Sequence, residues 1–152
     1  DGMRYEFDPN RIFTDKGIEK TLKQFGGYSR PAHDAVKNLA HHITALLPTH
    51  TRIIAVHNNQ HYSLREYFTG RPLAHEAAAL NVADNAATRN FYLVTQVADY
   101  TKLKSAGFNG LLQSDTAADD GSLSIYLAKY PYVNVEAAYG ALEAQIAMLR
   151  AI

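Results

Sequence analysis

Short runs of apolar residues bounded by polar ones recur along the chain, and this pattern is typical of covered β-strands. The runs occupy residues 53–57, 91–95 and 132–137. A weaker signal, in which charged and aromatic residues alternate, covers residues 4–7 and stops at Pro9. The pattern therefore predicts three buried strands and one marginal strand near the N-terminus.

Apolar residues at helical spacing predict helices between these strands. The clearest is an amphipathic helix that starts at Pro31 and ends before Pro48. Thr14 is a suitable N-cap for one helix and Ser122 for another. The predicted helices cover residues 17–25, 31–47, 122–129 and 139–151, with a short helix or turn at residues 99–105.

The remaining segments carry weaker signals. Residues 62–67 are expected to form a loop or a further strand. Residues 74–87 are alanine-rich and either helical or loosely ordered, and residues 113–121 are expected to form a polar loop. The final helix has one expected apolar face, made of Leu142, Ile146 and Leu149.

Strands that alternate with helices predict an α/β fold. We expect a central mixed, largely parallel sheet with helices on both faces. No internal repeat, low-complexity tract or clear linker interrupts the 152 residues. The chain is therefore expected to form a single domain over residues 1–152.

Composition narrows the classes of function. Fifteen basic and fifteen acidic residues cancel, which argues against nucleic acid and membrane surfaces as partners, since both attract basic patches. No run approaches the roughly 18 apolar residues that a membrane span requires. Cysteine is absent, so a bound metal would require His, Asp or Glu ligands.

Two polar residues in the predicted strands are candidates for chemistry. His57 ends an apolar run, at the position where ligands collect in open α/β sheets. Its alternative role is that of a structural, hydrogen-bonded histidine. Glu136 lies within the apolar run VNVEA, where burial of an unpaired carboxylate is costly. Its alternative role is that of an exposed residue on an edge strand.

The other histidines are weaker candidates. His61 stands four residues after His57, but a metal-binding pair at this spacing requires a helix, and residues 53–57 predict a strand. His61 is therefore discounted as a ligand. Solvated or half-buried positions on the helix of residues 31–47 are expected for His33, His41 and His42.

Three short motifs stand in order along the chain: DPNRIF, VHNN and GSLSIYLAKYPYVNVEA. Together they resemble the zinc carboxypeptidase and aspartoacylase superfamily, which includes succinylglutamate desuccinylase-like proteins. Asn10 and Arg11 match the Asn-Arg pair of that superfamily. His57 matches its third zinc ligand, at the end of a strand. Glu136 matches its catalytic glutamate, on a late strand that follows a Gly-Ser segment.

The resemblance implies a role for each matching residue. His57 would be a metal ligand, and Glu136 would be the general base that removes a proton from water. Asn10 and Arg11 would bind a substrate carboxylate, and Ser122 of the Gly-Ser segment would contribute to substrate binding. Arg4 is a candidate for a second anion-binding arginine, with a solvent-facing position as its alternative.

The chain departs from the family pattern at its N-terminus. The first two zinc ligands of the family lie in an HxxE motif ahead of the Asn-Arg pair. Only nine residues precede Asn10 here, and no histidine is followed by Glu three residues later. We therefore expect Zn with two further ligands outside this chain, in a missing N-terminal portion of a longer domain; the alternative is a lineage that has lost the metal. The expected protein partner is that missing portion or a second copy of the chain.

The resemblance implies a zinc-dependent hydrolase, a metallocarboxypeptidase or amidohydrolase. Its substrate would have an amide bond adjacent to a free carboxylate, as in a peptide, a cell-wall peptide or an N-acyl amino acid. One alternative is a metal-free module of the same fold that binds a carboxylate ligand. Another is a structural domain in which the matches are coincidental. A periplasmic or secreted location is what peptide-processing enzymes of this type imply.

Overall fold

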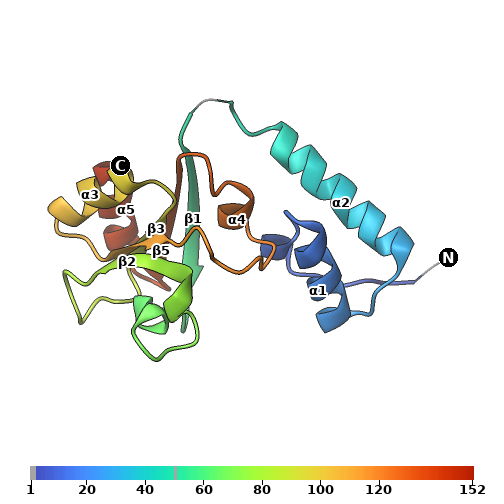
Figure 1. Ribbon diagram of the computed structural model, residues 1–152, viewed down its shortest axis with the longest axis horizontal. Helices are drawn as coiled ribbons and strands as arrows, with labels where there is room; N and C mark the ends of the chain where they lie inside the picture. Colours follow the sequence, from blue (N-terminus) through green and yellow to red (C-terminus); the bar gives the residue numbers. More distant parts are fainter. Residues whose placement is uncertain (1–2, 50) are drawn as a thin grey trace. The chain divides into compact units, whose positions relative to one another are not determined.

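The computed structural model describes residues 3–49 and 51–152, and these cluster into two compact units. Unit 1 combines Asp1–His50 with Ala118–Tyr126, and unit 2 combines Thr51–Ala117 with Leu127–Ile152. Figure 1 shows helices in unit 1 and a sheet in unit 2. The prediction of one domain stays a prediction, and each unit is described by itself.

Unit 1 is built from helices. They are the 3-10 helix η1 and the α-helices α1, α2 and α4, at Pro9–Arg11, Asp15–Phe25, Arg30–Ala45 and Leu123–Tyr126. The predicted cap at Thr14 is confirmed, because its Oγ1 accepts a hydrogen bond from Gly17 N at 3.0 Å. Ser29 caps α2 in the same way, with its Oγ accepting from Ala32 N at 3.2 Å. Helix α4 is shorter than the predicted helix over residues 122–129.

The core of unit 1 explains two corrections. Residues 3–8 form no strand, so the strand predicted at residues 4–7 is wrong. Instead, Tyr5 and Phe7 pack against the core cluster between α1 and α2. His33 on α2 is buried rather than solvated or half-buried, with its ring edge-on to Tyr28, whereas His41 and His42 are exposed.

Residues 119–122 lie against the start of α1. Thr14 Oγ1 donates to Asp119 Oδ1 at 2.7 Å, and Phe13 N donates to Gly121 O at 2.9 Å. A Cβ atom on Gly17 would lie 2.2 Å from the Gly121 Cα atom, so only glycine permits this approach. Gly121 itself has φ of 81°, the left-handed region that favours glycine. This contact joins two segments of unit 1 that lie far apart in the sequence.

Unit 2 contains a five-stranded sheet with the strand order β1-β5-β3-β4-β2. In chain order, strands β1 to β5 are Ile53–Asn59, Ala77–Asn81, Phe91–Val94, Gly110–Gln113 and Tyr132–Ala138. β5 is parallel to β1 and antiparallel to β3; β4 is parallel to β3 and antiparallel to β2. The α/β class is confirmed, but the sheet is mixed, and the expectation of a largely parallel sheet is wrong.

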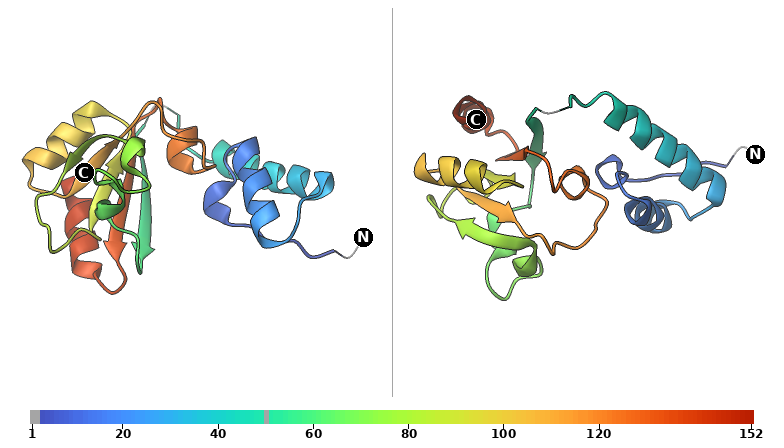
Figure 2. Two further views of the ribbon diagram at one scale, coloured as in Figure 1. Left: turned by 60° about the horizontal axis from the view of Figure 1, so that its bottom comes forward. Right: turned by 45° about the horizontal axis from the view of Figure 1, so that its top comes forward.

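Both α-helices of unit 2 pack on the same face of the sheet (Figure 2). They are α3, Val97–Ser105, and α5, Leu142–Ala151. Leu103 of α3 and Met148 of α5 join one core cluster with side chains of β3 and β5. The opposite face carries the 3-10 helix η2, Leu64–Tyr67, whose Tyr67 ring contacts Phe91 of β3. Within unit 2, the second face is therefore covered by a 3-10 helix rather than by an α-helix.

Two strands fall where none was predicted. The alanine-rich segment forms η3, Ala74–Glu76, and then β2, because Ala77–Asn81 pairs with β4. β4 begins at Gly110 and ends at Gln113, which is buried rather than part of a polar loop. Both strands are short, and long-range pairing rather than local propensity determines them. These two strands account for the antiparallel edge that the sequence did not reveal.

Helix α5 buries a different face from the predicted one. Leu142 is 61% exposed and Leu149 is 39% exposed, whereas Gln145 and Met148 are buried. Gln145 Nε2 donates to the His57 carbonyl oxygen at 3.0 Å, which satisfies a backbone acceptor of β1. This polar contact with the edge strand accompanies the burial of Gln145, and apolar periodicity could not predict it. In the described part of the chain, no helix is long and apolar enough to cross a membrane.

We predict that Tyr92→Phe destabilises unit 2 by about 1 kcal/mol at neutral pH, because the Tyr92 hydroxyl donates to the Met148 carbonyl oxygen at 2.7 Å. Burial raises the pKa of Tyr92 above its ordinary value. The stability that depends on its protonated form is therefore full below about pH 10 and falls as the pH rises, because the unfolded chain loses this proton first. Chemical denaturation at several pH values above about 10 measures how the free energy of unfolding falls with pH. This fall should be shallower in Tyr92→Phe than in the wild type, by up to about 1.4 kcal/mol per pH unit. The exposed Tyr130→Phe is the control, and equal slopes in all three proteins would contradict the prediction.

We predict that Gly17→Ala destabilises unit 1 by about 1–3 kcal/mol, because the added methyl group meets the backbone of Gly121. Thermal unfolding followed by circular dichroism measures the effect. Gly27→Ala is the control, since its Cβ meets nothing within 4 Å and carries only the left-handed strain of about 1 kcal/mol. A smaller loss in Gly17→Ala than in Gly27→Ala would rule out the close approach.

Candidate functional site

His57 and Glu136 occupy paired positions on neighbouring parallel strands. The register of β1 and β5 places His57 directly opposite Glu136. Paired residues of adjacent strands project from the same face of a sheet, so both side chains belong to the face opposite α3 and α5. Two residues that the sequence singled out separately are thus neighbours near the carboxyl ends of their strands.

Glu136 is a buried residue of an inner strand. Its exposed fraction is 5%, and β5 lies between β1 and β3. The alternative role, an exposed glutamate on an edge strand, is therefore wrong. Phe91 of β3, which is fully buried, pairs with Glu136 on the side away from His57. The carboxylate thus lies between an imidazole-bearing strand and an apolar one.

Two neutral amides donate to the Glu136 carboxylate. Asn59 Nδ2 donates to Oε2 at 3.2 Å, and Asn134 Nδ2 donates to Oε1 at 3.1 Å. Asn59 follows His57 by two residues on β1, and Asn134 precedes Glu136 by two residues on β5, so all four side chains share one face. These hydrogen bonds offset part of the desolvation cost of the carboxylate and leave acceptor capacity on both oxygens.

Arg89 holds the Asn59 side chain from the other side. Arg89 Nε donates to Asn59 Oδ1 at 3.1 Å, and Arg89 Nη2 donates to the Asn59 carbonyl oxygen at 2.6 Å. The sequence interpretation missed Asn59, Asn134 and Arg89. The motifs VHNN and VNVEA carried a signal for the two asparagines, because each places an amide two residues from a candidate. No local pattern indicated Arg89.

The predicted substrate-binding residues lie in unit 1. Asn10 and Arg11 belong to η1, and Arg11 Nε lies 3.5 Å from Asp120 Oδ2. Ser122 follows Gly121, and its hydroxyl lies 3.0 Å from the hydroxyl of Ser124. Unit 1 therefore brings Arg11 close to the Gly-Ser segment. Arg4 is exposed in the segment that precedes η1, so its substrate-binding role stays a prediction.

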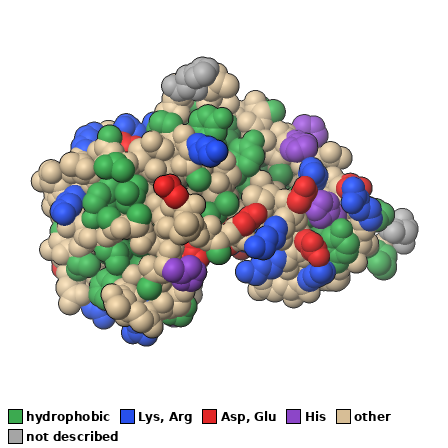
Figure 3. Space-filling model, viewed as in Figure 1, with side chains coloured by type: hydrophobic (Ala, Val, Ile, Leu, Met, Phe, Trp, Pro, Cys, Tyr) green, Lys and Arg blue, Asp and Glu red, His purple; other side chains and the backbone are tan. Residues whose placement is uncertain are grey.

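Charged side chains of both signs alternate over α1 and α2 (Figure 3). Lys37 Nζ lies 2.8 Å from Asp15 Oδ1, and Lys23 pairs with Glu19. The hydrogen bond from Lys37 lowers the pKa of Asp15. This surface therefore carries paired charges rather than a basic patch of one sign.

The donor set of the described residues does not by itself form a zinc site. Among residues 3–49 and 51–152, no group of three His, Cys, Asp or Glu side chains has an arrangement that could hold a metal ion. His57 and Glu136 are adjacent, whereas His61 is exposed in a bend after β1. A metal held in the way the resemblance implies would thus require ligands from outside these residues.

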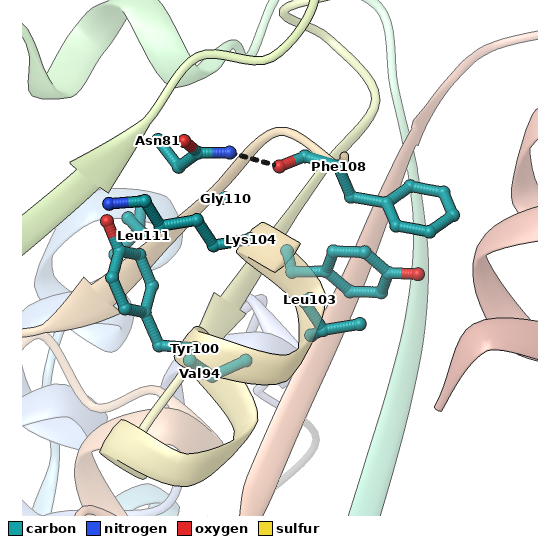
Figure 4. Close-up of a pocket in the computed structure, with 9 residues that line it drawn as sticks. Asn81, Val94, Tyr100, Leu103, Lys104, Phe108, Gly110 and Leu111 are labelled. Atoms are coloured by element: carbon teal, nitrogen blue, oxygen red, sulfur yellow. Dashed lines mark hydrogen bonds between the residues drawn. The ribbon is translucent and has the colours of Figure 1, made fainter. Parts of the chain in front are cut away.

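A small cavity lies on the other face of the sheet, under α3 (Figure 4). Its volume is about 10 Å³, enough for at most one water molecule. Tyr100 and Lys104 of α3 line it, and desolvation raises the pKa of Tyr100. The cavity includes none of the candidate residues, so it does not contribute to the site at His57 and Glu136.

Comparisons with protein-family models, with curated proteins and with solved structures find no match to this chain. The candidate site therefore rests on the geometry of His57, Glu136 and the residues that contact them.

Proposed function

We propose that this chain contributes the general base and one metal ligand to a zinc-dependent hydrolase. The bond cut is an amide adjacent to a free carboxylate, in a peptide, a cell-wall peptide or an N-acyl amino acid. The observation that carries the proposal is the direct pairing of His57 with Glu136. A buried carboxylate beside an imidazole, on an inner strand, is costly for a purely structural role and suited to proton transfer.

Glu136 acts as the general base. It takes a proton from an attacking water molecule, whose oxygen bonds to the amide carbon. Glu136 then gives that proton to the leaving nitrogen as the C–N bond breaks, so the products are a carboxylic acid and an amine. Zinc, when bound, supplies Lewis-acid activation of water and carbonyl, with His57 as the ligand from this chain.

Within unit 1, Arg11 is suited to bind a carboxylate, and Asn10 adds a neutral donor. The guanidinium of Arg11 presents a planar fork that matches a carboxylate. Its present partner is Asp120, and both side chains are about two-fifths exposed. An ion pair this exposed is worth at most about 1 kcal/mol, so a substrate carboxylate displaces Asp120 at low cost.

We predict that Glu136→Gln lowers kcat by about 10²–10⁴-fold, because the amide cannot accept the proton from water. The assay uses the product of the complete coding sequence, with peptides and N-acyl amino acids as substrates and with metal content measured on the purified protein. The matched control is Glu143→Gln, an exposed position on α5, which should retain activity. His57→Ala should lower both zinc content and activity.

Two results would contradict the proposal: absence of zinc from the purified protein, or hydrolysis that His57→Ala and Glu136→Gln leave unchanged. Binding of a carboxylate ligand that survives both a chelator and Glu136→Gln would instead support the metal-free binding module.

A further inference from the structure

We infer that Arg89 and Asn59 are positioning residues that fix the direction of the Glu136 carboxylate. The catalytic consequence of this inference rests on the proposed role of Glu136 as a base. The geometric part stands independently, because it follows from the hydrogen bonds of the Asn59 amide.

Hydrogen bonds fix the orientation of the Asn59 side-chain amide. Its Nδ2 donates to the Arg89 carbonyl oxygen at 3.0 Å and to Glu136 Oε2 at 3.2 Å. Its Oδ1 accepts from Arg89 Nε at 3.1 Å. A rotation of the amide by 180° would turn Oδ1 toward the carboxylate and the Arg89 carbonyl oxygen, and Nδ2 toward the guanidinium, so all three hydrogen bonds would be lost. Arg89 therefore determines that Asn59 offers a donor to Glu136.

A purely structural link between Arg89 and β1 would not require a hydrogen bond to the Asn59 side chain. The bond from Arg89 Nη2 to the Asn59 carbonyl oxygen already joins the residue to the end of β1. The additional bond from Nε to Oδ1 acts only on the side chain of Asn59, whose Nδ2 donates both to the Arg89 carbonyl oxygen and to Glu136. The second nitrogen of the guanidinium thus serves the orientation of the carboxylate.

The segment that carries Arg89 is itself tied to the ends of β1 and β5. The next residue, Asn90, accepts a hydrogen bond at Oδ1 from Ala138 N at 2.8 Å. Asn59 O and Ala138 N are backbone groups at the carboxyl ends of the two strands that carry His57 and Glu136. Arg89 and Asn90 therefore fix the ends of β1 and β5 relative to each other. The Asn59 amide, which bonds to both Arg89 and Glu136, orients the carboxylate relative to these strand ends.

This arrangement favours a general base over an ion-paired carboxylate. The positive charge of Arg89 reaches Glu136 through a neutral amide rather than by direct contact. Direct contact with a guanidinium would form an ion pair and occupy the carboxylate oxygens that must accept the proton from water. A neutral donor fixes the geometry at a smaller electrostatic cost.

We predict that Asn59→Ala, Arg89→Ala and Arg89→Lys lower kcat by about 10–100-fold while KM changes little, because a displaced base loses its alignment with water. Lysine lacks the planar fork and cannot reproduce both bonds. Added guanidinium ion should restore part of the activity of Arg89→Ala but not that of Asn59→Ala. The matched controls are Arg65→Lys and Asn85→Ala, which disrupt an exposed Arg–Asn pair, and they should retain wild-type kcat. Unchanged kcat in folded Asn59→Ala and Arg89→Lys would overturn the catalytic part of the inference.

A second measurement is independent of activity. In NMR spectra of the full chain, the Asn59 side-chain amide protons should shift in both Glu136→Gln and Arg89→Lys and stay unchanged in Arg65→Lys. Amide signals that respond to neither variant would overturn the geometric part. If the wild-type protein hydrolyses none of the substrates, the proposed function fails, and these shifts alone decide whether Arg89 and Asn59 orient Glu136.

Discussion

The parallel ladder between β1 and β5 is the constraint on which unit 2 depends. β5 is the strand that joins the two halves of the sheet, because it is parallel to β1 on one side and antiparallel to β3 on the other. A shift of this register by one residue would move Glu136 to the face of α3 and α5, where Val133 and Val135 are now fully buried. The apolar cluster on that face therefore excludes the shifted pairing. The same packing that stabilises the sheet keeps Glu136 opposite His57.

The sequence predicted the elements whose signals are local. The strands of residues 53–57, 91–95 and 132–137 are mostly apolar, and the structure confirms them as β1, β3 and β5. The first two helices were predictable because Thr14 and Ser29 are N-caps that act within three residues of chain. β2 and β4 were not predictable, since an alanine-rich segment and a strand that begins at glycine have little intrinsic β-propensity. Their pairing partners decide their structure, and the sequence pattern does not indicate those partners.

In the candidate site, too, residues with a local signal were predictable and residues that depend on long-range contacts were not. His57 and Glu136 were predictable because each interrupts or ends an apolar run. The motif VHNN places an amide near His57, but Asn59 contacts Glu136 only through the register of β1 with β5. Arg89 was not predictable, because it contacts Asn59 only through the course of the segment before β3. A polar residue in an apolar strand thus reveals that a partner must exist, but the fold alone identifies the partner. For the same reason, the apolar periodicity of α5 predicted the wrong buried face. Gln145 is buried and bonds to the His57 carbonyl oxygen, which is distant in the sequence.

Because Glu136 is buried, its carboxylate depends on the hydrogen-bond donors around it. The buried carboxylate is satisfied only while its two amide donors stay in place, since the free-energy cost of an unsatisfied buried group exceeds the net value of either bond. Asn134 is held by the strand that it shares with Glu136, whereas Asn59 belongs to the edge strand and would be the more mobile donor without a second restraint. Arg89 supplies that restraint at both the side chain and the backbone of Asn59. The guanidinium therefore acts where the hydrogen-bond shell of Glu136 is otherwise weakest, which is why an arginine with a planar fork suits this position and a lysine does not.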